Sequence, residues 1–422
     1  MKTLKYDGIE EVIYNFKCDN GLYVYLCTNN LSKNFFISLG VRYGASTTEY
    51  KKNDKKYKVT PGIAHFIEHR VLDFTKDKEA EEKVRNLGSF PNAMTNYMTT
   101  RYLMFGSLDI NENMKVLFDR VFSPNFKASD IDKEKGIILE EYYMYQDDPG
   151  SAIFETLSEA MYNNYYMKTS VLGKQNDIKS ISKEEIERIY NDFYVPENMY
   201  LVITGAFNAT EVEDFVTKYM KKIKKKDFVA KTIYKKEKLN VCVNYQEKQM
   251  EVSEEKVALG FKCDIKEFNK MHPTKTGYYI SIILNSLFSP TSSLFERYKE
   301  SKLISTSFGT SRNIEDDFFD IKIIVDTENP NEFIDNIKKD LSDFEISKSD
   351  FERKKKMILS EVILNFENIQ SANDFISYHV NKFKDPILEF HSIIKELNYE
   401  ECLKIKKLIN IDNLTIVKVI KQ

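Results

Sequence analysis

The chain has 422 residues, which corresponds to roughly two or three domains, and 42% of its residues are hydrophobic and 30% charged. This composition excludes disordered and fibrous proteins. The 62 basic and 65 acidic residues leave a net charge of −3, which argues against a global nucleic-acid-binding role.

The sequence contains no run of about 18 apolar residues, so no membrane-spanning helix is predicted. The first 20 residues alternate charged and apolar types and lack the apolar core of a signal peptide. The five cysteines are scattered and show no paired spacing, which favours reduced thiols in a cytoplasmic protein.

The first half of the chain alternates strand and helix patterns. Segments rich in β-branched and aromatic residues predict strands over 21–28, 34–43, 90–96, 101–107 and 199–204. A helix is expected to begin near Thr60-Pro61-Gly62, because proline suits a first helical turn. Further helices are predicted over 112–122, 129–146, 152–162, 183–193 and 210–221.

A lysine-dense segment follows, at 221–238, with little apolar periodicity. We interpret it as a solvated linker rather than as a polyanion-binding site. The second half then repeats the rhythm of the first. Strands are predicted over 257–262, 306–310 and 318–325, and helices over 274–287, 292–300, 330–344, 348–366, 372–383 and 387–408.

The two halves also end alike. Asn198-Met-Tyr-Leu-Val-Ile and Asn413-Leu-Thr-Ile-Val-Lys are 413 − 198 = 215 residues apart, which is about half the chain. We therefore predict two similarly folded α+β domains, at 1–222 and 241–422, joined by a lysine-rich linker at 223–240.

Two of the five histidines fall within one five-residue window, His65-Phe66-Ile67-Glu68-His69. On a helix, His65 and His69 lie one turn apart and can direct two imidazoles at one metal ion, with Glu68 on the same side. The pattern suits a zinc ion that binds water beside a carboxylate that removes the water's proton. It is the HxxEH order of inverted zincins. A packing role for the helix does not explain two histidines at this spacing.

A catalytic zinc ion usually takes three protein ligands and leaves one position for water. The predicted helix over 129–146 offers Glu134 and Glu141, which are seven residues apart and share a face, whereas Glu140 is rotated by about 100° from Glu141. One of the pair can bind zinc while the other orients a ligand. The spacing does not distinguish the two, and a solvated acidic face is the alternative.

At these residues the sequence resembles the pitrilysin/insulinase family of zinc metallopeptidases. The resemblance is carried by Pro61-Gly-Ile-Ala-His65-Phe-Ile-Glu68-His69 and, 141 − 69 = 72 residues later, by Ile137-Ile-Leu-Glu-Glu141. It implies two α/β-sandwich domains related by internal duplication, each with a mixed, mostly antiparallel sheet covered by helices.

The resemblance also implies one zinc ion per chain, bound by His65, His69 and Glu141. It implies that Glu68 is the general base and that Glu134 is the acidic residue that orients a ligand. This assignment chooses between the two carboxylates that the spacing leaves open.

The segment Asn92-Ala93-Met94-Thr95-Asn96 resembles the edge strand on which members of the family hold a substrate peptide. The resemblance implies that Asn92, Ala93, Met94 and Thr95 contact the substrate. An extended peptide pairs with an open strand edge through main-chain hydrogen bonds, so such recognition depends only loosely on side chains.

The second half resembles the family's non-catalytic repeat, through Ser292-Ser-Leu-Phe-Glu-Arg-Tyr-Lys-Glu-Ser-Lys-Leu-Ile304. Many members carry here an arginine and, seven residues later, a tyrosine that hold the substrate and its developing oxyanion. This chain has Lys299 and Thr306 instead. Lysine lacks the fork of arginine, and threonine cannot place a phenol hydroxyl at that distance.

Some bacterial members of the family divide the zinc site and the arginine–tyrosine pair between two chains, and this chain resembles the zinc-carrying one. We therefore expect a zinc endopeptidase that cleaves extended peptides in a clam-shell chamber, with a related subunit as its partner in a heterodimer. A homodimer in which Lys299 and Thr306 replace the pair is the alternative assembly. Two other functions stay open: maturation of one dedicated precursor peptide, and a non-catalytic assembly subunit, against which the intact ligand positions argue.

Overall fold

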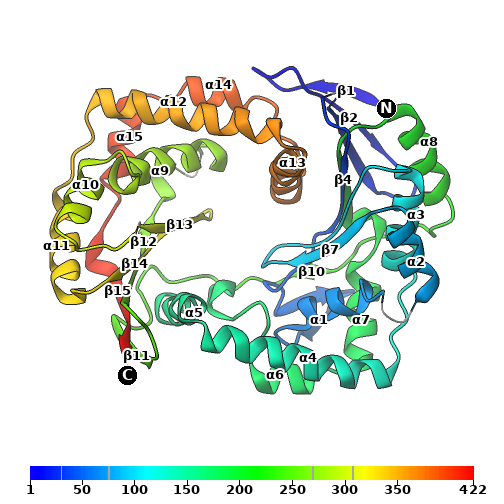
Figure 1. Cartoon of the computed structure of the whole chain (residues 1–422), viewed down its shortest axis with the longest axis horizontal. Helices are drawn as coiled ribbons and strands as arrows, with labels where there is room; N and C mark the ends of the chain where they lie inside the picture. Colours follow the sequence, from blue (N-terminus) through cyan, green and yellow to red (C-terminus); the bar gives the residue numbers. More distant parts are fainter. Residues whose placement is uncertain (30, 75–76, 269, 307) are drawn as a thin grey trace. The chain divides into compact units, whose positions relative to one another are not determined.

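The computed structural model describes residues 1–29, 31–74, 77–268, 270–306 and 308–422 (Figure 1). The chain forms two compact units, and each unit is assembled from three segments. Unit 1 contains Met1–Tyr142, Ser170–Tyr234 and Ile363–Phe390, and unit 2 contains Tyr143–Thr169, Lys235–Val362 and His391–Gln422.

Unit 1 is built on a seven-stranded sheet with the order β1-β2-β3-β9-β4-β8-β7. Its strands are β1 (Lys2–Lys5), β2 (Val12–Lys17), β3 (Tyr23–Thr28), β4 (Phe35–Val41), β7 (Phe90–Thr95), β8 (Thr100–Gly106) and β9 (Met199–Gly205). The β3–β9 pair is parallel and the other neighbouring pairs are antiparallel. Every residue of β4 and β9 is buried, as expected of central strands covered on both faces.

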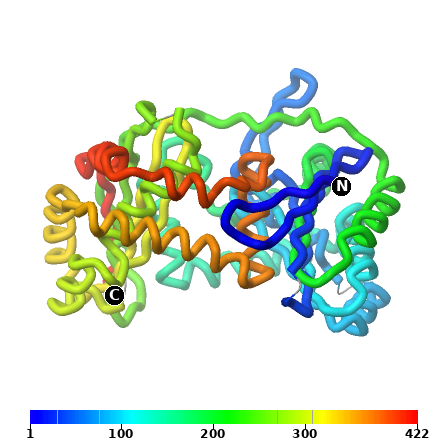
Figure 2. The backbone as a smooth tube through the Cα atoms, turned by 90° about the horizontal axis from the view of Figure 1, so that it is seen from above, coloured from blue at the N-terminus to red at the C-terminus, as the bar shows by residue number. Residues whose placement is uncertain are grey.

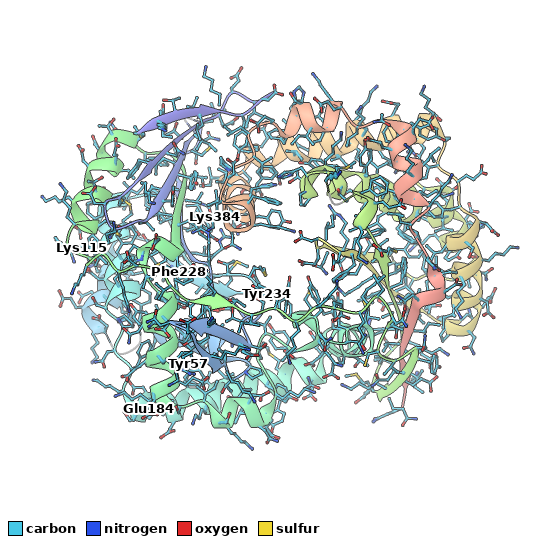
Figure 3. All side chains as sticks on the ribbon, turned by 180° about the vertical axis from the view of Figure 1, so that it is seen from behind. Tyr57, Lys115, Glu184, Phe228, Tyr234 and Lys384 are labelled. Atoms are coloured by element: carbon cyan, nitrogen blue, oxygen red, sulfur yellow. The ribbon has the colours of Figure 1, made fainter. Side chains whose placement is uncertain are left out.

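A smaller three-stranded sheet also belongs to unit 1. It has the order β10-β5-β6 and consists of β5 (Glu49–Lys52), β6 (Lys55–Lys58) and β10 (Lys231–Thr232). Tyr57, labelled in Figure 3, stacks on Tyr50 in this sheet with the ring centroids 5.1 Å apart. The pairing of β10 with β5 shows that the predicted linker takes part in unit 1 before the chain leaves it.

The helices of unit 1 cover its large sheet. They are α1 (Ile63–Val71), α2 (Lys78–Asn86), α3 (Ile110–Phe122), α4 (Ala128–Asp147), α6 (Gln175–Ser180), α7 (Lys183–Phe193), α8 (Ala209–Met220) and α13 (Ile369–Phe383). Several begin at a polar residue whose side chain accepts a main-chain N–H of the first turn, as Ser182 does for α7 and Asn208 for α8. The boundary between the units falls within α4, after Tyr142.

Unit 2 is built on a five-stranded sheet with the order β11-β15-β12-β14-β13. Its strands are β11 (Tyr245–Met250), β12 (Glu255–Asp264), β13 (Gly309–Ile314), β14 (Phe318–Thr327) and β15 (Leu414–Lys421). Its helices are α5 (Pro149–Met161), α9 (Pro273–Phe288), α10 (Ser293–Glu300), α11 (Pro330–Asp343), α12 (Lys348–Leu364), α14 (Phe390–Lys395) and α15 (Tyr399–Lys406). Within the described ranges, no helix has the length and apolar character that a bilayer-spanning segment needs.

The two sheets share one five-strand topology. In unit 1 the strands β3, β4, β7, β8 and β9 have the spatial order first-fifth-second-fourth-third, and β11 to β15 have the same order in unit 2. In both units the first and fifth strands pair in parallel and the remaining pairs are antiparallel. The predicted α+β fold is confirmed, and the shared strand order supports its origin by duplication.

Each unit receives one helix from the other half of the sequence. Figures 1 and 2 show α13, from the late part of the chain, beside the early strands of unit 1, where it packs on β4 and β9. Helix α5, from the first half, packs on β12 and β15 of unit 2. The compact units therefore differ from the continuous domains predicted at 1–222 and 241–422, because each apolar sheet face is covered by a helix distant in sequence.

The passage from unit 1 to unit 2 occurs between Tyr234, labelled in Figure 3, and Lys235, inside the predicted linker. Most lysines of this segment are exposed, but the Glu237 side chain is only 2% exposed and lies 2.6 Å from Lys262 Nζ. The segment is thus partly anchored rather than solvated throughout.

Two elements of the second half differ from the prediction. The single helix expected over 387–408 is wrong: α14 ends at Lys395, and Asn398 caps a separate helix, α15, by accepting the N–H of Glu401. The strand expected over 306–310 begins later, at Gly309, and residue 307 lies outside the described residues. In both places a polar turn interrupts an apolar pattern that sequence periodicity reads as continuous.

Candidate metal and peptide site

Helix α1 is fixed in place at its first residues. Gly62, before the first turn, has a φ of 87°, and a Cβ atom there would lie 2.1 Å from the Leu172 carbonyl oxygen, so only glycine fits. Thr60 donates its N–H to Glu185 Oε1 at 3.0 Å and its hydroxyl to Glu185 Oε2 at 2.7 Å. The start of α1 is therefore anchored to α7 and to the loop at Leu172.

Both interpretations of α1 hold together. Its residues Ile63, Phe66 and Ile67 are buried in the core, and the helix packs on β7 and β8. On its remaining face, His65 and His69 lie one turn apart with ring centroids separated by 4.5 Å. The apolar residues hold the helix on the sheet, and this anchoring directs the two imidazoles toward α4.

Helix α4 brings a carboxylate to the two histidines. Glu141 Oε2 lies 3.7 Å from His65 Nε2 and 3.6 Å from His69 Nε2. One ligand atom of each of the three residues lies within 4.8 Å of the others, and this is the cluster of metal-ion size that the described residues form.

The donor set and its spacing fit a zinc ion. Two imidazole nitrogens and one carboxylate oxygen are a ligand set typical of catalytic zinc, and ligands about 2.1 Å from one tetrahedral ion lie about 3.4 Å from each other. The two measured nitrogen–oxygen separations are close to this value. The cluster leaves the fourth position of a tetrahedral ion without a protein ligand, as a catalytic site requires.

Glu134 contacts the other side of the His69 ring. Its Oε1 lies 2.9 Å from His69 Nδ1, and its Oε2 accepts a hydrogen bond from Arg70 Nη1 at 2.8 Å. The spacing along α4 leaves Glu134 and Glu141 equivalent, but the structure separates them: Glu141 faces the Nε2 atom of His69 and Glu134 faces Nδ1. A carboxylate on Nδ1 fixes the tautomer that leaves Nε2 free as a ligand.

The surroundings shift the pKa of each group in the cluster. Burial, together with the charge of His69, lowers the pKa of His65 to about 3, so His65 is neutral near pH 7. Burial alone would lower the pKa of His69, but the hydrogen bond and charge of Glu134 outweigh it and raise this pKa. Burial raises the pKa of Glu141.

Glu68 connects α1 to strand β7. It is 8% exposed, and its Oε2 accepts a hydrogen bond from Thr95 Oγ1 at 2.5 Å. Burial raises the pKa of Glu68, while the bond from Thr95 acts in the opposite direction. A carboxylate with a raised pKa beside two candidate metal ligands is poised to exchange a proton.

Strand β7, which carries Asn92, Ala93, Met94 and Thr95, is the terminal strand of its sheet and pairs with β8 alone in that order. The Ala93 N–H donates to Asn92 Oδ1 at 2.8 Å instead of to β8, so it points toward the open edge. Because outward and inward positions alternate along a strand, Thr95 also faces outward. The outward edge at Ala93 and the Glu68 contact thus lie two residues apart on one strand.

Lys299 and Thr306 belong to unit 2, whereas the residues of the cluster belong to unit 1. The Lys299 ammonium, on α10, donates to the carbonyl oxygens of Ser305 and Thr306, the second at 3.4 Å. Lys299 is therefore engaged by the main chain of the turn that follows α10.

Three contacts escaped the sequence analysis: the bond of Thr95 to Glu68, the bonds of Arg70, and the anchoring of Thr60 by Glu185. Each joins residues that are more than 25 positions apart, so no local spacing could reveal them. Only the position of Arg70, directly after the HxxEH motif, gave a signal that could have been followed.

Family models match most of the chain. The model described as "Insulinase (Peptidase family M16)" matches residues 53–175, and the model described as "Peptidase M16 inactive domain" matches residues 180–358. The first match contains the whole cluster in α1 and α4, and the second contains most of the sheet of unit 2.

Curated relatives agree with these matches. The uncharacterized zinc protease YmfH of Bacillus subtilis is 26% identical over 438 positions, covering 100% of this chain and 99% of the relative. The beta subunit of human mitochondrial-processing peptidase is 28% identical over 200 positions, covering 46% of this chain and 37% of that protein.

Solved structures share the fold. A crystal structure of an M16-like peptidase from Alicyclobacillus acidocaldarius superposes with a TM-score of 0.91 at 21% identity, covering 99% of this chain and all of that one. A protease from Helicobacter pylori gives a TM-score of 0.81 at 17% identity over 97% of this chain and 99% of that one. Taken with the HxxEH motif and the duplicated sheets, these matches show that the chain belongs to the pitrilysin/insulinase (M16) family of proteases.

Proposed function

We propose that this chain is a zinc-dependent endopeptidase that hydrolyses extended peptides. The proposal is supported above all by one observation: the ligand atoms of His65, His69 and Glu141 converge within 4.8 Å. Several relatives carry the name zinc protease, which agrees with a zinc ion at these residues.

His65, His69 and Glu141 would hold the ion, with the unprotonated Nε2 atoms as the two nitrogen ligands. A zinc ion bound there would supply Lewis-acid activation of a water molecule and of the scissile carbonyl. Glu134 keeps the proton of His69 on Nδ1, so the protein presents two lone pairs and one carboxylate to the ion.

Glu68 acts as the general base. It accepts the proton of the attacking water and later passes it to the leaving amine, which converts one carboxylate into base and then acid. Its raised pKa brings its proton affinity closer to neutral pH, as this double role requires. Thr95 holds the carboxylate by one oxygen and leaves the other for the water.

The open edge of β7 binds the substrate backbone. An extended peptide adds to the sheet as a new strand, and the outward N–H and C=O groups of Ala93 and Thr95 form the main-chain hydrogen bonds. The Asn92 side chain, which accepts the Ala93 N–H in the free protein, must turn away when the substrate carbonyl takes that donor. Met94 is 38% exposed and can contact a substrate side chain.

We propose further that a related subunit completes the enzyme as a heterodimer. Lys299 and Thr306 do not supply a guanidinium or a phenol, so charge stabilisation at the scissile carbonyl would come from a second chain. Relatives named as the beta subunit of mitochondrial-processing peptidase make a subunit role plausible for this chain. The same names favour processing of a dedicated precursor as the second candidate function. The five cysteines form no disulfide, which supports placement in the cytoplasm.

The test is cleavage of an unstructured peptide mixture by the purified, zinc-loaded chain, compared with Glu68→Gln. We expect the variant to keep its zinc and to lose turnover by about 100- to 10,000-fold. The matched control is Glu140→Gln, an exposed glutamate one residue before Glu141, which should keep full activity. Undiminished cleavage by Glu68→Gln would refute the proposed base. Zinc binding without cleavage by the unsubstituted chain would point to the obligate partner.

A further inference from the structure

Arg70, the residue that follows the HxxEH motif, lies among three carboxylates. Its side chain is 4% exposed. Nη1 donates to Glu134 Oε2 at 2.8 Å and to Asp73 Oδ2 at 2.9 Å, and Nη2 lies 3.6 Å from Asp130 Oδ2. These partners come from the turn after α1 and from the first part of α4. Arg70 therefore joins the end of the metal-site helix to the helix that carries Glu141.

The Glu134 carboxylate is shared between two donors. One oxygen meets His69 Nδ1 at 2.9 Å, and the other accepts the bond from Arg70. A carboxylate held at one oxygen can still rotate, whereas one held at both oxygens has a fixed plane. The guanidinium fork is suited to this task, because its donors are coplanar and rigid.

The same contacts fix α4 against α1. Asp130 and Glu134 are one helical turn apart on α4, and Glu141 lies two further turns along the same face. Holding the first turns of α4 to Arg70 sets the position of Glu141 relative to His65 and His69. A buried guanidinium facing three carboxylates is costly to disrupt, since either partner left alone keeps an uncompensated charge.

We propose that Arg70 is a positioning residue for the metal site: it holds Glu134 against His69 and sets the distance between α4 and α1, so that zinc affinity depends on its guanidinium. The inference rests on the proposed function, because it takes the ion to be bound by His65, His69 and Glu141.

The experiment measures the zinc dissociation constant of the full chain by competition with a chromogenic chelator. We expect Arg70→Met to weaken zinc binding by about 10- to 100-fold, the range typical of residues that orient a metal ligand. Arg70→Lys keeps the charge without the fork and should fall between the two. Arg85→Met removes an exposed arginine that pairs with Glu81 and should leave zinc affinity unchanged.

A double-substitution cycle separates positioning from a general structural role. If Arg70 acts through Glu134, adding Arg70→Met to Glu134→Gln costs little further zinc affinity, because the carboxylate it holds is already gone. If Arg70 only stabilises the fold, the two effects add. Should Arg70→Met fail to fold, Arg70→Lys in the same cycle carries the test.

The outcomes are distinguishable. Zinc affinity of the Arg70 variants equal to that of the unsubstituted chain, or fully additive effects in the cycle, would overturn the role of Arg70 alone. Failure of the unsubstituted chain to bind zinc would overturn the proposed function as well.

Discussion

Helices α4 and α12 occupy corresponding places in the two units, and their sequences can be compared position by position. The offset is 220 residues, as in 350 − 130, and it pairs these positions: Asp130 with Asp350, Ile131 with Phe351, Glu134 with Lys354, Ile138 with Ile358, and Glu141 with Glu361. At three of them, the second, third and fourth pairs, both residues are buried. The packing face of the helix is therefore kept while its chemistry differs.

The difference is concentrated at one position. In unit 1, Glu134 accepts hydrogen bonds from His69 and Arg70. In unit 2, the fully buried Lys354 donates to the hydroxyls of Ser289 and Thr291, at 2.5 Å and 2.9 Å. An acceptor that orients a histidine has become a donor that pins a loop. The corresponding burial shows that the site of unit 1 was built on, or lost from, a position set by packing.

Glu361 shows that a carboxylate alone makes no metal site. Like Glu141, it has a pKa raised by burial, but the charged groups acting on it are Arg312 and Lys354 rather than histidines. Among the residues that the structure describes, the metal-sized cluster lies in unit 1 only. The comparison teaches that the two histidines of α1 decide which unit can hold zinc.

The largest expected effect on stability comes from the polar contacts that anchor the exchanged helices. Lys262→Met would leave the Glu237 carboxylate, 2% exposed, without its cation. It should lower the free energy of unfolding by about 3 to 5 kcal/mol. Arg101→Met in unit 1 breaks a pair with Asp374, which is 49% exposed, and should cost less, about 1 to 3 kcal/mol. Urea unfolding curves measure both, and a larger loss for Arg101→Met would contradict this ranking.

Zinc itself should stabilise unit 1. An ion present at 1,000 times its dissociation constant raises the free energy of unfolding by about 4 kcal/mol when it binds only the folded state. Thermal unfolding with and without zinc should show this stabilisation for the unsubstituted chain and for Lys354→Met, but not for His65→Ala. A zinc effect that survives His65→Ala would mean that the ion binds elsewhere.

Glu134→Gln and Lys354→Gln form a matched pair at corresponding positions. The first should weaken zinc binding by about 10- to 100-fold, because the amide orients His69 less firmly than the carboxylate does. The second should leave zinc affinity unchanged. Chelator competition measures both constants, and equal affinities for the two variants would remove the distinction between the units.

Zinc affinity should also fall with pH. Glu134 raises the pKa of His69 above its usual 6.5, so the ion must displace a proton from His69 as the pH falls through that pKa. Below it, each pH unit should weaken binding by about tenfold, while His65, with a pKa of about 3, adds no dependence in this range. Dissociation constants measured between pH 5.5 and 7.5 test the slope. Glu134→Gln should move its onset to lower pH, and a flat profile would contradict the role of His69.

Local patterns predicted the parts of the site that lie on single helices. The HxxEH spacing placed His65, His69 and Glu68 together on α1, and a seven-residue interval placed Glu134 and Glu141 on one face of α4. Periodicity could not tell which carboxylate meets which nitrogen, because that depends on how α4 packs on α1. The family resemblance chose Glu141 as the ligand, and the distances to Nε2 are consistent with that choice.

The exchanged helices show where sequence reasoning ended. The segments of α5 and α13 were expected to be helical, and both are, but an amphipathic pattern does not say which sheet a helix covers. For α13 the decision is made by Asn373, whose amide donates to the Phe36 and Val202 carbonyls, and by Arg101, which reaches Asn373 and Asp374. These contacts span more than 170 residues of sequence.

The most direct test of the account is the zinc content of Glu141→Gln and Glu361→Gln, two substitutions at corresponding positions of α4 and α12. We predict one zinc ion per chain for the unsubstituted protein and for Glu361→Gln, and loss of the tightly bound ion in Glu141→Gln. Tight zinc binding by Glu141→Gln, or its loss in Glu361→Gln, would contradict the placement of the metal site in unit 1.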